Sequence, residues 1–136
     1  MKQLNQFITE YIVKKKLEKP IDSEDHYDYF PETKSELSKI IQNLIKNNQT
    51  DLNVIDVSKI SDMSELFDKI NQSIEISNID ISRWDVSNVT NMENMFFNCT
   101  KFDCDLSNWD VSNVKNMRRM LTWSPLEKNP PKWYKE

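Results

Sequence analysis

The sequence of 136 residues contains no glycine at all. Nucleotide-binding loops of the Walker and Rossmann types need glycine where the backbone approaches a phosphate group, so the absence of glycine excludes both kinds of site. Turns that require a positive φ angle must then use asparagine or aspartate, which tolerate this conformation better than other residues. Asparagine is abundant in the chain, and we expect it to take positions that glycine fills in other proteins.

Cysteine and histidine are scarce, with only Cys99, Cys104 and His26 in the chain. His26 lies far from both cysteines, so the three residues make a poor zinc site. The favoured interpretation of the cysteines is two small buried residues in a reducing compartment, with a local disulfide as the alternative. His26 has no accompanying nucleophile motif, and no pair of carboxylates is singled out by its spacing. The sequence therefore predicts no catalytic residues, no cofactor and no enzymatic activity.

Long hydrophobic runs are also missing. No stretch approaches the roughly 20 apolar residues that span a bilayer, and residues 1–6 lack the apolar core of a signal peptide. We therefore expect a cytoplasmic protein of a bacterial host cell, with no membrane contact.

The net charge of −4 is distributed unevenly along the chain. Residues 1–50 are neutral overall, residues 51–123 carry a net charge of −5, and residues 124–136 carry +1. Because an acidic surface repels nucleic-acid backbones, we expect no direct contact with DNA or RNA. The expected partner is a protein with a basic surface.

Two amphipathic helices are expected at the front of the chain. Apolar residues recur with helical spacing over residues 3–17, which predicts the first helix. The second begins at a capping box, in which the side chains of Thr33 and Glu36 bond backbone N–H groups at the helix start. Its apolar stripe runs through residues 37–45. Each helix has one apolar stripe, so we expect residues 1–50 to form a helical cap on the remainder of the chain.

A thirteen-residue unit recurs in the second half of the chain. Residues 80–92 return as residues 105–117, and a weaker first copy occupies residues 51–63. The Trp-Asp-Val-Ser part alternates in polarity, as a short strand with one buried face does. Downstream of it, apolar residues follow the i, i+3, i+4 spacing of a helical turn. The residues expected to share one core are Met63, Leu66, Phe67, Met92, Met95, Phe96, Met117, Met120 and Leu121.

A repeat of about 25 residues with one short strand and one short helix is typical of leucine-rich-repeat geometry. The sequence therefore predicts an α/β fold, a short strand–helix solenoid of about three repeats with an N-terminal helical cap. Trp84 would lie above Trp109 in a parallel sheet, with Ile55 completing the row. Since no single repeat buries its own apolar surface, both ends need caps. The predicted domains are the cap (1–50), the repeats (51–123) and a capping tail (124–136).

The unit Trp-Asp-Val-Ser-Asn-Val-x-Asn-Met-x-x-Met resembles the repeat of the BspA-like leucine-rich-repeat family, and the resemblance covers residues 51–121. It implies a strand–helix solenoid, a role in protein–protein or cell-surface contact, and no catalytic residues. Members of that family occur in bacterial surface proteins and, in shorter forms, in phage and mobile-element genomes. This chain has few repeats and no evident export signal or anchor, which favours an intracellular or phage-borne binding role over adhesion.

Aspartate recurs at two positions of the repeat, namely Asp51, Asp80 and Asp105, and Asp56, Asp85 and Asp110. The favoured interpretation is that each carboxylate accepts backbone N–H bonds in the adjacent turn. A calcium site and a charged binding strip are the alternatives. Calcium is less favoured because its ligands usually cluster within one loop, whereas here they are spread one per repeat.

The outward face of the predicted sheet is the candidate protein-binding surface, because repeat scaffolds commonly carry recognition on exposed faces. Its candidate residues are Val54, Asp56, Ser58, Arg83, Asp85, Ser87, Asn108, Asp110 and Ser112. We therefore expect a non-enzymatic protein–protein interaction module. The alternatives are an intracellular, phage-encoded inhibitor that occupies a basic nucleic-acid-binding surface of a host protein, and a structural assembly subunit.

Overall fold

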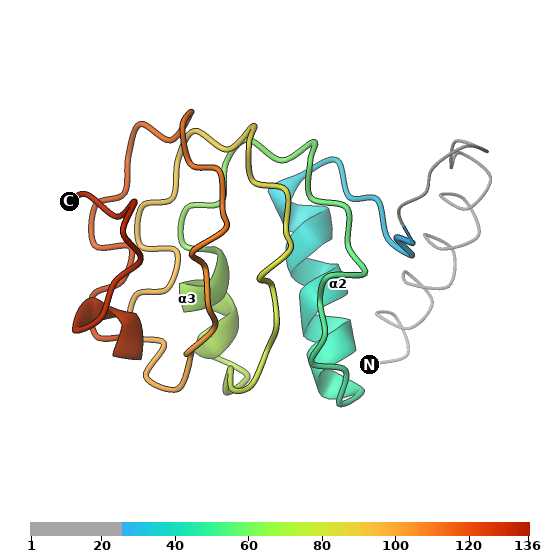
Figure 1. The fold of residues 1–136 in the computed structure, drawn as a ribbon. Helices are drawn as coiled ribbons and strands as arrows, with labels where there is room; N and C mark the ends of the chain where they lie inside the picture. Colours follow the sequence, from blue (N-terminus) through green and yellow to red (C-terminus); the bar gives the residue numbers. More distant parts are fainter. Residues whose placement is uncertain (1–25) are drawn as a thin grey trace.

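Residues 26–136 are described by the structure, which is a computed structural model. The helix predicted over residues 3–17 lies outside these residues. The described part of the chain contains two α-helices, α2 (Lys34–Lys46) and α3 (Leu66–Asn71), and one 3-10 helix, η1 (Pro125–Glu127). Figure 1 shows that successive loops of the chain lie side by side from α2 to the end of the chain.

Helix α2 begins where the capping box predicts. Thr33 is the extended N-cap residue, and its hydroxyl oxygen accepts the backbone N–H of Glu36 at 3.1 Å. The same hydroxyl lies 3.5 Å from the Glu36 carboxylate, to which it donates. The helix ends at Lys46, and its buried face packs into the core through Leu37, Ile40, Ile41 and Leu44.

The predicted strand–helix solenoid of leucine-rich-repeat type is wrong. Residues 26–136 contain no strand and no sheet, and their ladder contacts are isolated parallel bridges such as Asp51–Asp80 and Asp62–Asn91. Helix α3 follows the first copy, but the corresponding segments after the later copies form turns. The first copy is followed by a longer segment, because the copies begin 29 and then 25 residues apart. Helix α3 thus lies in the longer of the two segments between copies.

Tight turns replace the predicted strands. In the second copy, Trp84 N–H donates to the Ile81 carbonyl and Val89 N–H donates to the Val86 carbonyl. The same pair of bonds recurs in the first and third copies. Backbone donors that a strand would offer to a neighbouring strand are therefore bonded locally, so a continuous ladder does not form.

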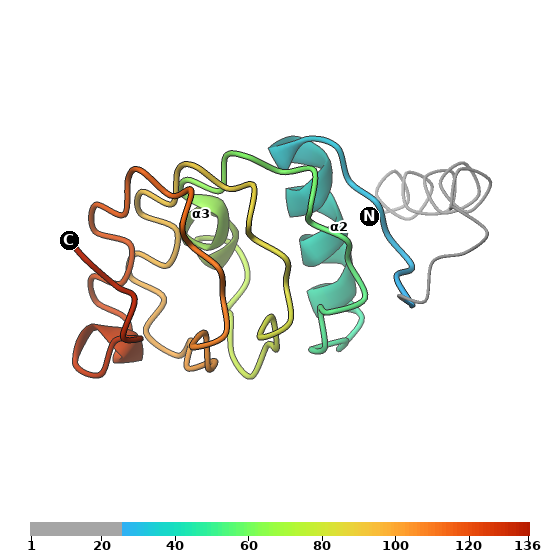
Figure 2. The ribbon, with the colours of Figure 1, turned by 45° about the horizontal axis from the view of Figure 1, so that its top comes forward.

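The second halves of the copies lie side by side (Figures 1 and 2) and are joined by regular backbone hydrogen bonds. Met63 N–H donates to the Asn91 carbonyl at 2.9 Å, and Met92 N–H donates to the Asn116 carbonyl at 2.8 Å. From Met63 and from Met92 onward the donor lies in the earlier copy and the acceptor in the later one. Just before these residues the direction is reversed, because Thr90 N–H donates to the Ser61 carbonyl and Lys115 N–H donates to the Thr90 carbonyl. The corresponding N–H groups of the last copy have no later copy whose carbonyl groups could accept them. They belong to Met117, Arg119, Leu121 and Trp123.

The predicted tryptophan row is confirmed. Trp84 and Trp109 are each 4% exposed, and Ile55 is 1% exposed. The Trp84 indole N–H donates to the Leu52 carbonyl at 2.9 Å, and the Trp109 indole N–H donates to the Ile81 carbonyl at 3.0 Å. Each tryptophan therefore fills the core of its own copy and also ties that copy to the preceding one.

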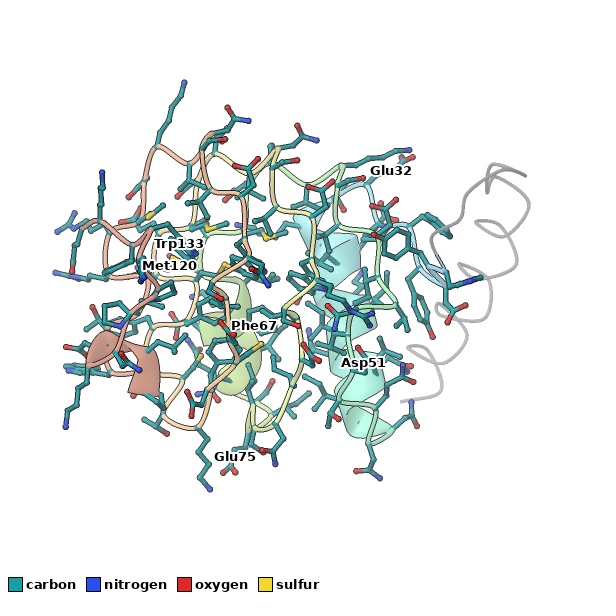
Figure 3. The ribbon with its side chains drawn as sticks, in the orientation of Figure 1. Glu32, Asp51, Phe67, Glu75, Met120 and Trp133 are labelled. Atoms are coloured by element: carbon teal, nitrogen blue, oxygen red, sulfur yellow. The ribbon has the colours of Figure 1, made fainter. Side chains whose placement is uncertain are left out.

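Trp133, which lies in the tail predicted to cap this end, continues the tryptophan row. Its indole N–H donates to the Leu106 carbonyl at 2.8 Å, and its ring stacks on Trp109 at 6.3 Å with planes 10° apart. Figure 3 shows Trp133 over the last copy, with Phe67 and Met120 inside the molecule. The tail thus begins a fourth unit.

The methionine and aromatic core is confirmed except at one position. Met92 and Met120 are fully buried, and the rings of Phe67 and Phe96 stack at 5.2 Å. Met117 is only partly buried, although it packs against the same cluster. It belongs to the last copy, where no further repeat covers it.

Asparagine substitutes for the missing glycine, as predicted. Within residues 26–136, four of the seven residues at positive φ are asparagine, while Glu65, Arg119 and Trp123 are the exceptions. Glu65, Asn94 and Arg119 occupy the same position in successive copies. The backbone therefore requires this conformation at one place in every copy, whichever side chain is present.

We expect Arg119→Asn to stabilise the protein by about 1 kcal/mol, because a left-handed residue with an ordinary side chain costs about 1–2 kcal/mol and asparagine tolerates it better. Thermal melting should show a rise of a few degrees. Arg118→Asn is the matched control, since it removes the same charge next to Arg119 at a residue without positive φ. Equal melting temperatures for the two variants would contradict the prediction.

Candidate protein-binding site

The predicted binding residues lie on turns, not on the face of a sheet. Val54 is partly buried against the core, so its predicted outward position is wrong. Asp56, Ser58 and Ser87 are half-buried. Five candidates are exposed, namely Arg83, Asp85, Asn108, Asp110 and Ser112.

The aspartates of the second repeat position hold their turns by side-chain bonds. Asp85 Oδ1 accepts the backbone N–H and the hydroxyl of Ser87, at 3.1 and 2.6 Å. Asp110 Oδ1 accepts the same two groups of Ser112, at 3.0 and 2.7 Å. Asp56 Oδ1 accepts the backbone N–H of Ser58 at 3.0 Å. The expectation that these carboxylates bond the adjacent turns is confirmed.

Asparagine side chains bring these corners side by side. The Asn88 amide donates to the Ser58 carbonyl at 2.8 Å, and the Asn113 amide donates to the Ser87 carbonyl at 2.6 Å. Each corner is thus tied to the corner of the preceding copy. Sequence reasoning missed this role, although the recurring Ser-Asn pair was its signal. We call the three adjacent carboxylates the acidic row; its members are Asp56, Asp85 and Asp110.

The acidic row has unused acceptor capacity. Within residues 26–136, the Oδ2 atoms of Asp85 and Asp110 have neither a hydrogen bond nor an ion pair. Arg83 lies near the row in sequence, but its guanidinium is 4.0 Å from Asp51 Oδ2. No hydrogen bond or ion pair joins Arg83 to Asn108 in the described structure.

A third corner with the same geometry was not anticipated. Asp62 Oδ1 accepts the N–H of Ser64 at 2.9 Å. Asn91 and Asn116 make the equivalent bond in the next two copies, each at 3.0 Å. Because asparagine and aspartate serve equally here, the turn requires an acceptor oxygen and not a charge.

Serine donors lower the pKa of several corner carboxyls. The Ser82 hydroxyl and N–H hold the pKa of Asp80 below its usual value of 3.8. The N–H and hydroxyl of Ser107 lower that of Asp105, and the Ser112 hydroxyl and N–H lower that of Asp110. These bonds therefore favour the ionised carboxylates, and they stabilise the folded chain only while those carboxylates remain ionised.

We expect the melting temperature to fall as the pH drops below about 4. A lowered folded-state pKa adds stability above the unfolded-state pKa, and this stability is lost as the pH falls through the folded-state pKa. The triple variant Asp80→Asn, Asp105→Asn and Asp110→Asn should flatten this dependence in melting curves between about pH 2 and 6. Asp103→Asn, which removes an exposed carboxylate without a turn bond in the described structure, should leave it unchanged. A wild-type slope in the triple variant would contradict the assignment.

The cysteines do not form a reactive pair. Both thiols are free and buried, as the favoured interpretation predicts. Burial, with a smaller effect of the Asp68 charge, raises the pKa of Cys99 to about 12. Burial also raises the pKa of Cys104. Both thiols are therefore protonated at neutral pH. Within residues 26–136, no three His, Cys, Asp or Glu side chains are grouped so that they could hold a metal ion.

A family model described as "Mycoplasma protein of unknown function, DUF285" matches residues 35–134. The chain belongs to the DUF285 family. The match to DUF285 covers α2 from its second residue, all three copies and Trp133. No curated protein and no solved structure matches the chain. No helix within residues 26–136 has the length and apolar character to cross a membrane.

Proposed function

We propose that this DUF285 chain is a non-enzymatic protein–protein interaction module that binds a basic surface of its partner through the acidic row. The observation that supports this most is the unused Oδ2 atom of the exposed residues Asp85 and Asp110. The row offers carboxylate oxygens at a fixed spacing, and lysine and arginine side chains bind such oxygens.

The row is rigid before a partner arrives. Each Oδ1 atom is already bonded to its turn, and the turns are tied together by Asn88 and Asn113. A side chain held in this way loses little conformational entropy on binding, which favours affinity.

The charge around the row supports the same partner chemistry. Residues 51–110 contain twelve acidic and four basic residues. All four bases form ion pairs within the chain: Lys59 with Glu32, Lys69 with Glu65, Arg83 with Asp51, and Lys101 with Glu75. The remaining acidic residues create a field that attracts a basic protein and repels nucleic acid.

A basic nucleic-acid-binding surface of a host protein is one partner that fits this chemistry. In that role the chain is an intracellular inhibitor, and the carboxylates of the row stand in for phosphate groups. A relation to the BspA-like repeat proteins, which rests on the recurring Trp-Asp-Val-Ser-Asn unit, and a cytoplasmic location are parts of this proposal.

The test uses a fluorescent nona-arginine peptide as a basic probe, with binding measured by fluorescence anisotropy. The row variant Asp85→Asn with Asp110→Asn keeps the turn bonds and removes two charges. The control, Asp28→Asn with Asp103→Asn, removes two exposed charges elsewhere. We expect the row variant to bind the probe several-fold more weakly than the control, and wild-type binding to weaken as salt screens the charges. Equal affinities for the two variants would overturn the proposal.

A further inference from the structure

The charge of the chain changes sign towards its end. Residues 111–136 contain six basic and two acidic residues, the reverse of the balance in residues 51–110. These residues form the second part of the last copy and the tail, which lie together at one end of the molecule (Figure 1). The six bases are Lys115, Arg118, Arg119, Lys128, Lys132 and Lys135.

The acidic residues at this end are engaged with the backbone of the last copy. Glu136 accepts the N–H of Arg119, and Glu127 accepts the N–H of Trp123. The tail thus supplies acceptors for two of the four N–H groups that would otherwise donate to a further copy.

The basic side chains at this end form no ion pairs within residues 26–136. None of the six forms an ion pair with another residue of the described chain, although all four bases of residues 51–110 do. The contrast leaves a concentration of unpaired positive charge at the end and of unpaired negative charge along the row.

An exposed tryptophan lies in the same region. Trp123 is 62% exposed, and it is the exposed large hydrophobic residue of the described chain. Its ring rests against Phe97 at 5.0 Å, with the planes 41° apart. Tryptophan and arginine are the residue types most enriched at the energetic centres of protein interfaces.

We propose that the basic end of one protein molecule, made of Lys115, Arg118, Arg119 and Trp123, binds the acidic row of a second molecule of the same protein. This rests on the proposed function, because the acidic row is the surface used, and it names the partner. Complementary charge on two separate surfaces of one chain supports a head-to-tail contact. Such a contact leaves one basic end and one acidic row unoccupied, so it propagates to longer assemblies unless the geometry closes a ring.

Two variants test the contact. Here the row variant is extended to three substitutions, Asp56→Asn, Asp85→Asn and Asp110→Asn. It keeps its turns because asparagine makes the same kind of bond at Asn91 and Asn116. The end variant carries Lys115→Gln, Arg118→Gln and Arg119→Gln. Trp123→Ser is a second end variant, in case the triple substitution lowers stability. Thermal melting checks the fold of each.

Sedimentation velocity measures the association. We expect the wild type to form dimers and larger species at about 10 mM salt, where charges act over about 30 Å, and to dissociate at about 1 M salt, where they act over about 3 Å. Each variant alone should be monomeric. An equimolar mixture of the row and end variants should form a dimer that does not grow, because only one basic end and one acidic row remain functional.

A monomeric wild type, or a mixture of the two variants that stays monomeric, would overturn head-to-tail binding. Head-to-tail binding would also be overturned if the basic end binds a labelled oligothymidine while the protein molecules do not associate with one another. If the row still binds nona-arginine in that case, the proposed function survives without this partner. Loss of both associations would overturn the proposed function as well.

Discussion

Met92→Asp is expected to leave the chain unfolded at 25 °C. The Met92 side chain has no exposed surface and packs in the centre of the core. Burial of an unpaired carboxylate costs several kcal/mol or more, with about 2–7 kcal/mol already lost for a neutral polar group. That cost is comparable to the whole stability of a small domain, about 5–15 kcal/mol. Circular dichroism and thermal melting measure the outcome.

Two further variants control this experiment. Met92→Leu nearly conserves volume and should cost less than about 1.5 kcal/mol. Met117→Asp should be milder than Met92→Asp, because Met117 is only partly buried. A Met92→Asp protein that melts cooperatively near the wild-type temperature would show that Met92 is not in the core.

Trp109→Ala is expected to destabilise the chain by about 3–5 kcal/mol, the range for removal of a large buried aromatic side chain. The Trp109 ring lies between Phe96 and Trp133, and its indole N–H bonds the Ile81 carbonyl of the preceding copy. The substitution therefore opens a cavity and breaks a tie between copies. Urea denaturation followed by circular dichroism gives the free energy of unfolding.

Trp123→Ala is the matched control, since Trp123 is 62% exposed. We expect this change to stay within about 1 kcal/mol of the wild type, as for most surface substitutions. Trp109→Phe separates the two contributions, because it keeps an aromatic ring and loses the indole donor. Similar unfolding free energies for the two alanine variants would contradict the buried tryptophan row.

The error in the fold prediction has a physical origin. Over the four residues Trp-Asp-Val-Ser, a strand and a pair of consecutive turns bury the same side chains. A longer stretch of sequence distinguishes the two structures. Ile81, Trp84, Val86 and Val89 are all buried, at successive spacings of three, two and three residues. A strand would alternate every second residue. The unequal spacing was visible in the sequence and indicates a turn at each side of the Trp-Asp-Val unit.

The core and the corners were predicted more closely than the backbone. Burial of Trp84 and Trp109 depends on side-chain chemistry and repeat phase, which do not require a strand. The Asp–Ser bonds are local, so the short separation in sequence was enough to predict them. The tail was predicted as a cap, but the place of Trp133 in the tryptophan row was not, because only its spacing of 24 residues from Trp109 marks a fourth unit.

The basic end was not predicted because the predicted tail began too late in the sequence. With a boundary between residues 123 and 124, Lys115, Arg118 and Arg119 were counted in the net charge of the acidic repeats. Contacts between copies reveal the end, because they show which N–H groups face away from the preceding copy. Such contacts depend on how the copies lie beside one another, and no local pattern in the sequence encodes them.

The third corner has a consequence for how such a surface can change over evolution. Asp62, Asn91 and Asn116 hold equivalent turns with equivalent bonds. Exchange of one carboxylate oxygen for an amide nitrogen therefore alters the charge of a corner while its backbone stays in place. The electrostatic character of the surface is thus separable from the backbone architecture beneath it, and selection can adjust the choice of partner corner by corner while each turn is kept.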